Sequence, residues 1–420
     1  MIERRNFILH VLNGVLFAVS EAFTDPNLVV TALLSQLTTS NVLIGLLAPL
    51  RDTGWFLPQL FISPWIERMP RKARFYAKIT VVRGAGWVAL CTILFTLTQP
   101  QALLAAFFGC MLLISLAAGF AGLPFMTVTQ KVIPHRRMGL LFGLRQFIGG
   151  GLGILVSGTI GVILAGNAFG LHLAFPGNYG LLFVIGTAFF FVASTSFGLI
   201  KEEPDPIPNR ITPLGTQLRR AREVFASNVR FRNFFFLRVA LMFGMTCIPF
   251  MTVFARRVLG ASDAYLGSLV PVTLSASLLS NLAWARITDR IGSRWVLTVC
   301  AVLGSGLCGI VLVIVLVTST GSTPWVLLPL TYALGGAISS GIGGATTPQI
   351  IEIVPHGQGP LYFGLLNTLL GVVMLCTSLV GLIADNVSYG ALFAFCGLCF
   401  AVALERTRML HHSSVEANGP

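Results

Sequence analysis

The chain consists of long apolar runs separated by short polar breaks. Twelve runs have about the 20 mainly apolar residues that a helix needs to cross a membrane. They cover residues 7–33, 41–65, 75–97, 102–130, 139–165, 179–200, 233–257, 264–285, 295–319, 325–350, 360–384 and 389–404. A membrane β-barrel is excluded, because its strands alternate in polarity over about ten residues. We therefore predict an all-α membrane protein with twelve transmembrane helices.

Composition agrees with this prediction and excludes two other classes of protein. Of the 420 residues, 55% are hydrophobic and only 10% are charged. A soluble fold of this length needs a larger charged surface, and a disordered chain is rich in polar and charged residues. The formal net charge of +13 would indicate nucleic-acid binding in a soluble protein. In a membrane protein its distribution has another explanation.

Basic residues mark one side of the predicted helices. Of the 28 Lys and Arg residues, 22 lie in the termini, the middle segment and the 2–3, 4–5 and 8–9 connections. Only Arg256 and Arg257 lie on the opposite side. Because basic residues accumulate on the cytoplasmic side, both termini are predicted to be cytoplasmic. We predict a multi-pass protein of the plasma membrane, the inner membrane of a bacterium, with no nucleic-acid partner.

The two halves of the chain resemble each other after a shift of about 222 residues. Glu67-Arg68 then matches Asp289-Arg290, and Pro134-His135 matches Pro355-His356. An internal repeat of this kind is typical of membrane transporters. The predicted parts are an N-terminal half at 1–200, a cytoplasmic linker with an amphipathic helix at 201–232, a C-terminal half at 233–405 and a cytoplasmic tail at 406–420.

One loop motif resembles that of the major facilitator superfamily, whose 2–3 and 8–9 loops carry Gly-x-x-x-Asp-Arg-x-Gly-Arg. Residues 285–294 read Ala-Arg-Ile-Thr-Asp-Arg-Ile-Gly-Ser-Arg. The first loop departs further, since Glu67 replaces Asp and Pro70 replaces the second Gly. The resemblance extends over residues 7–404. It implies two pseudo-symmetric six-helix halves that alternate access to a central site. The sequence contains no H-E-x-x-H, P-loop or G-x-S-x-G motif, so no enzyme activity, cofactor or metal is predicted.

The same loops suggest a cytoplasmic gate. A carboxylate where a loop meets the next helix can accept backbone N–H groups and pair with an arginine. We predict such a gate at Glu67, Arg68, Asp289 and Arg290. The alternative is that these residues are static anchors at the membrane interface.

Several charged side chains lie inside the predicted spans. Each costs roughly 2.5–3.5 kcal/mol at the bilayer centre. At the repeat positions of Arg51 and Asp52 the second half has Thr273 and Leu274, so the fold does not require these charges. We predict substrate binding or proton coupling by Glu21, Asp25, Arg51, Asp52, Trp55, Arg83, Gln146 and Asn367. The alternative is a buried ion pair, of Glu21 or Asp25 with Arg51, that only orients helices.

Polar residues also gather on one face of the first span. Asn13, Ser20 and Thr24 share this face when the run is wound as a helix, and Glu21 and Asp25 extend it. We expect this face to line water or substrate. Span 7, the counterpart in the second half, is instead rich in Phe and Met.

These features favour a monomeric secondary transporter surrounded by membrane lipids. The preferred function is proton-coupled export of a hydrophobic or amphipathic small molecule, because membrane-embedded carboxylates occur together with an aromatic, Met-rich second half. The first alternative is uptake or facilitated passage of a polar solute such as a sugar or an organic ion. A non-transporting receptor and a lipid scramblase are more distant alternatives.

Overall fold

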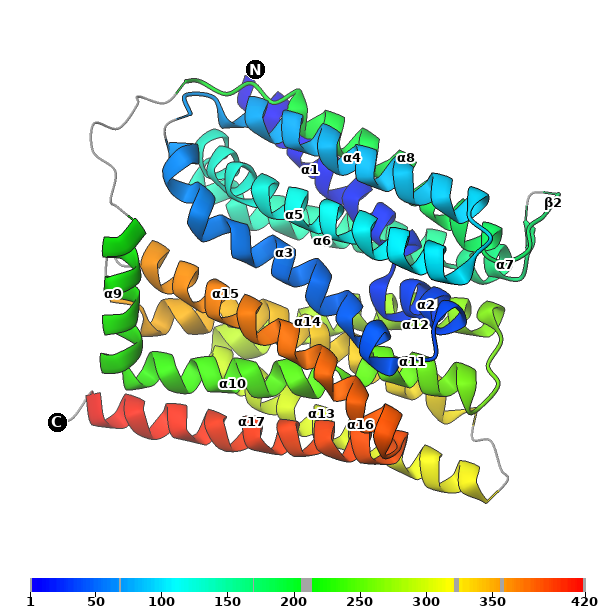
Figure 1. The fold of residues 1–420 in the computed structure, drawn as a ribbon. Coiled ribbons are helices and arrows are strands. Elements are labelled where there is room, and N and C mark those ends of the chain that lie inside the picture. Colours follow the sequence, from blue (N-terminus) through cyan, green and yellow to red (C-terminus); the bar gives the residue numbers. More distant parts are fainter. Residues whose placement is uncertain are drawn as a thin grey trace. The chain divides into compact units, whose positions relative to one another are not determined.

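The computed structural model describes residues 2–67, 69–168, 170–204, 214–320, 325–355 and 359–417. Long helices make up nearly all of this part, and ten of them are long and apolar enough to cross a membrane (Figure 1). The prediction of an all-α membrane protein is confirmed. The predicted spans at 41–65 and 325–350 form helices α3 (Asn41–Glu67) and α14 (Leu327–Ile353), which are not among the ten. The count of twelve crossings therefore stays a prediction.

The chain divides into two compact units. The first unit contains Met1–Thr39, Leu47–Ile211 and Gly260–Pro271. In it α4 lies along α5 and α8, and α1 lies along α6 and α8 (Figure 1). Its elements are α1 (Ile2–Phe23), the π-helix η1 (Pro26–Val30), α2 (Thr31–Leu37), most of α3, α4 (Lys72–Thr96), α5 (Pro100–Val132), α6 (His135–Ser157), α7 (Ile160–Leu164), the hairpin β1 (Asn167–Ala168) and β2 (Leu171–His172), and α8 (Gly177–Gly198).

The second unit contains Ser40–Leu46, Thr212–Leu259 and Val272–Pro420. In it α13 lies along α14 and α17, and α10 lies along α17. Its elements are α9 (Leu214–Ser227), α10 (Val229–Met245), α11 (Cys247–Arg257), most of α12 (Asp263–Ile291), α13 (Ser293–Ser319), α14, α15 (Gly359–Cys376), the 3-10 helix η2 (Thr377–Val380), α16 (Gly381–Asn386) and α17 (Tyr389–Ala417). The domain boundaries drawn from the sequence stay predictions.

The first span of each half is broken rather than continuous. Helix α1 ends at Phe23 and α10 ends at Met245, two positions that the repeat shift of about 222 residues superimposes. In the first break Pro26 has no N–H to continue the helix, so the carboxylate of Asp25 starts the next turn instead. The predicted run at 7–33 therefore contains most of α1, all of η1 and part of α2, and the run at 233–257 contains most of α10 and all of α11, although each still forms one candidate span.

A close helix contact positions α3 against α5. The hydroxyl oxygen of Ser115 lies 2.7 Å from the carbonyl oxygen of Leu50 and 2.6 Å from that of Arg51. A Cβ atom at Gly54 would collide with the side chain of Ser115. Small residues at such a crossing let two membrane helices approach closely. This contact fixes the part of α3 that carries Arg51.

Replacing Gly54 by alanine is expected to lower the free energy of unfolding by about 1–3 kcal/mol, because the added methyl group forces α3 and α5 apart. Thermal unfolding of the purified protein measures this change. Gly109→Ala on α5 is the control, since nothing lies within 4 Å of a Cβ atom there. Equal unfolding temperatures for the two variants would show that the contact is not tight.

Candidate functional site

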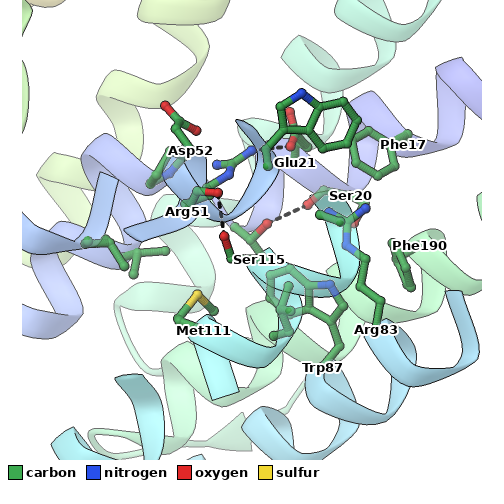
Figure 2. Close-up of a pocket in the computed structure, with 17 residues that line it drawn as sticks. Phe17, Ser20, Glu21, Arg51, Asp52, Arg83, Trp87, Met111, Ser115 and Phe190 are labelled. Carbon is green, nitrogen blue, oxygen red and sulfur yellow. Dashed lines mark hydrogen bonds and ion pairs between the residues drawn. The ribbon is translucent and has the colours of Figure 1, made fainter. Parts of the chain in front are cut away.

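A cavity of about 330 Å³ lies within the first unit, between α1, α3, α4, α5 and α8 (Figure 2). This volume is at the lower end of the range for small-molecule sites. Charged and aromatic side chains share its wall. The charged ones are Glu21, Arg51, Asp52 and Arg83, and the aromatic ones are Phe17, Trp55, Trp87 and Phe190. A mixed wall of this kind fits a small molecule with both a polar and an apolar part.

An ion pair joins α1 to α3 at the cavity. The guanidinium Nη2 of Arg51 contacts the carboxylate Oε1 of Glu21, and Figure 2 shows the two side chains turned toward each other. Their side chains are 36% and 44% exposed, so the pair is accessible from the cavity. Of the two partners that the sequence allowed for Arg51, the structure places Glu21 in contact.

Of the two other predicted acids, one lines the cavity and the other does not. Asp52 lines the cavity, and Figure 2 shows its carboxylate directed away from the Glu21–Arg51 pair. Asp25 is not part of the cavity wall. Its Oδ1 accepts hydrogen bonds from the backbone N–H groups of Asn27 (3.0 Å) and Leu28 (2.8 Å). Asp25 therefore caps η1, which is a structural role.

The guanidinium group of Arg83 lies near two aromatic rings. Its guanidinium carbon lies 5.3 Å from the ring centre of Phe17 and 5.0 Å from that of Phe190, within the range of cation–π attraction. Its Nε is buried and has no hydrogen-bond partner among the described residues. The indole Nε1 of Trp87, on the same helix, is likewise buried without a partner in the described part of the chain.

The polar face of α1 only partly lines the cavity. The Oγ of Ser20 donates to the carbonyl of Gly186 (2.7 Å), and the Nδ2 of Asn13 donates to the carbonyl of Ala193 (2.8 Å). Both acceptors are on α8. These bonds hold α1 against α8, and only Ser20, Glu21 and Thr24 of the expected face also reach the cavity wall.

The remaining predicted residues lie elsewhere. Gln146 is exposed on α6, and Asn367 is half-buried on α15; neither lines this cavity. Asp289 and Arg290 are exposed at the end of α12. The side chain of Glu67 and the whole of Arg68 lie outside the described residues, so the cytoplasmic gate stays a prediction.

Glu202 has the contacts that the sequence suggested for a gate carboxylate. One oxygen accepts a hydrogen bond from the backbone N–H of Ala73 (2.8 Å) in the first turn of α4, and the other lies 3.7 Å from Nζ of Lys131. In the second unit Glu352 accepts a hydrogen bond from Oγ of Ser293 (3.0 Å) in the first turn of α13. The repeat places Glu352 at the position of Lys131. The role of Glu202 was not predictable from the sequence, because its partner Ala73 lies 129 residues away.

Replacing Glu202 by alanine is expected to lower the free energy of unfolding by about 1–3 kcal/mol, since the first turn of α4 loses its acceptor. The Glu202 side chain is only 2% exposed, so water replaces it poorly. Glu203→Ala is the matched control, because Glu203 is exposed and Lys131 donates to its backbone carbonyl, which the substitution keeps. Thermal unfolding of both variants checks the prediction, and equal stabilities would contradict it.

The chain is similar to known proteins in its fold and, over part of its length, in its sequence. No curated protein sequence matches the chain. A mutant of the nucleoside transporter NupG has a similar structure, with 14% identity, a TM-score of 0.70 and coverage of 98% of this chain and 100% of the other. A D-xylose–proton symporter also has 14% identity and a TM-score of 0.70, with 97% of each chain covered. A POT family transporter has 11% identity and a TM-score of 0.68, and the match covers 98% of this chain and 96% of the other.

At these identities the structures show a shared fold. Sequence similarity to the family itself is found in the C-terminal part, where residues 234–410 match the model of the Major Facilitator Superfamily. The fold covers nearly the whole chain, including the N-terminal part that carries the cavity. The chain therefore has the fold of these transporters, and its C-terminal part is similar in sequence to the Major Facilitator Superfamily.

Proposed function

We propose that this protein is a secondary active transporter that exports an amphipathic small molecule and couples its movement to protons. The observation that carries this proposal is the half-exposed Glu21–Arg51 pair in a cavity with aromatic walls. The charged groups can hold the polar part of a substrate while the aromatic groups hold its apolar part. Alternating access through the superfamily fold would carry it across the membrane.

Glu21 supports the coupling to protons. A carboxylate that faces a cavity inside a membrane protein is the usual group for proton relay. Protonation of Glu21 would remove its negative charge and release the guanidinium of Arg51 into the cavity. Proton binding would thus change the charge that a substrate meets. Asp52, which lines the same cavity, is the second candidate for this role.

Uptake of an organic ion is the second candidate function. The observation in its favour is that four charged side chains line one small cavity, which is more charge than a purely apolar substrate needs. Solved structures of the same fold include transporters named for a nucleoside and for xylose. The direction of transport separates this candidate from export.

Transport measurements on reconstituted protein test the proposal. The purified protein is screened by thermal shift against amphipathic compounds, because a ligand stabilises the folded state by mass action. Each hit is then tested in liposomes for accumulation driven by an imposed proton gradient. We expect accumulation on the side from which protons move. Binding without accumulation under either gradient would exclude proton-coupled transport and would favour a receptor, a facilitator or a scramblase.

A further inference from the structure

The two arginines of the cavity differ in how their charge is used. Arg51 contacts the carboxylate of Glu21. Arg83 forms no ion pair within 4 Å among the described residues, and its buried Nε donates to nothing there. Its guanidinium lies over the rings of Phe17 and Phe190. The cavity therefore contains a cation that no contacting carboxylate neutralises in the described part of the chain.

Aromatic rings compensate this charge only in part. A cation–π contact contributes less free energy than the placement of an arginine inside the membrane costs. Rings also offer no hydrogen-bond acceptor to the five N–H groups of a guanidinium. An anion that enters the cavity would supply both the missing negative charge and the missing acceptors.

The shape of the guanidinium favours a particular anion. Its planar fork matches a carboxylate through two parallel hydrogen bonds. The indole N–H of Trp87 is a second buried donor without a partner in the described residues. Figure 2 shows Trp87, Phe190 and Arg83 together on one side of the cavity. This side offers donors and apolar surface, whereas the carboxylates of Glu21 and Asp52 belong to the other part of the wall.

We infer that the substrate of this cavity is an amphipathic organic anion. Its carboxylate binds Arg83, and its apolar body lies against Phe17, Trp87 and Phe190. The inference rests on the proposed function in one respect, namely that the cavity is the transport site. It adds the sign of the substrate's charge, which the fold does not determine.

Three probes test the inference. They share a phenyl group on a three-carbon chain and differ in charge: 3-phenylpropionate is an anion, 3-phenylpropionamide is neutral and 3-phenylpropylamine is a cation. Their affinities for the purified full-length protein are measured by calorimetry. We expect the carboxylate to bind at least about tenfold more tightly than the amide, and the amine to bind weakest. In Arg83→Gln this preference is expected to fall to within about twofold. Arg238→Gln, which removes a half-buried arginine of α10 whose Nε is buried, is the control and keeps the preference.

Arg83→Lys is the second variant if the glutamine variant does not fold. It keeps the charge and loses the planar fork, so the carboxylate preference is expected to shrink without disappearing. The inference is overturned if the amide or the amine binds as tightly as the carboxylate, if no probe binds, or if both Arg83 variants keep the full preference.

Counterflow of radiolabelled 3-phenylpropionate in liposomes separates this inference from the proposed function. Charge-selective binding without counterflow would contradict transport and support the anion site. Counterflow of the amide and the carboxylate at equal rates would support transport and contradict the anion site. Selective binding together with selective counterflow is the result expected from both.

Discussion

Liposomes that contain the Glu21→Gln variant are expected to lose substrate-driven proton flux by at least about tenfold relative to the wild-type protein. Glutamine has nearly the same volume as glutamate but cannot bind and release a proton. The cavity keeps its shape, and the amide can still accept a hydrogen bond from Arg51. Substrate exchange that moves no net proton is therefore expected to continue. A pH-sensitive dye trapped in the liposomes reports the flux.

Two further acids provide controls for this result. Asp25→Asn is expected to keep proton coupling within about twofold, because the asparagine oxygen can still cap η1. Asp52→Asn tests the second carboxylate of the cavity wall. Wild-type coupling in both the Glu21 and the Asp52 variants would exclude the cavity carboxylates as the proton carriers.

Arg51→Gln is expected to have the second large effect, a loss of both transport and stability. The substitution leaves the charge of Glu21 without its partner. Breaking a buried ion pair from one side costs about 3–5 kcal/mol. The side chains here are 36% and 44% exposed, so water compensates part of this loss. We expect a decrease of about 1–2 kcal/mol in the free energy of unfolding.

The double variant Glu21→Gln/Arg51→Gln separates a functional pair from a structural one. Two amides can hydrogen-bond to each other, so the double variant is expected to regain most of the lost stability. If the charges act in transport, proton-coupled transport stays lost in this folded protein. If the pair only orients α1 and α3, the double variant would transport like the wild type.

The positions of the helices and of the charges inside them were predictable from the sequence. Both follow from local chemistry, since long apolar runs form helices that cross the membrane and a charged residue inside such a run is easily recognised. The pairing of Glu21 with Arg51 links residues 30 positions apart on different helices. Arg51 and Asp52 have no charged counterparts in the repeat, so the sequence indicated that these charges serve something other than the fold.

The roles of single polar residues were less predictable. A polar face on a helix indicates that its side chains have hydrogen-bond partners. The sequence pattern is the same whether those partners are water molecules or backbone carbonyls. Asn13 bonds to a carbonyl on α8, and Asp25 bonds to the N–H groups just after it. The partners of Glu202 are distant in sequence. The helix breaks were not predicted, because a run can be apolar on average over its whole length while Pro26 interrupts the hydrogen bonding within it.

That substrate occupies the cavity of the first unit is tested most directly by counterflow in liposomes with Met111→Trp and Leu112→Trp. Met111 lines the cavity on α5, whereas Leu112 on the same helix is 44% exposed and does not line the cavity. An indole at 111 fills the space for substrate, so exchange is expected to fall at least about tenfold. The Leu112 variant is expected to stay within about twofold of the wild type. A folded Met111→Trp protein that exchanges substrate at the wild-type rate would contradict transport through this cavity.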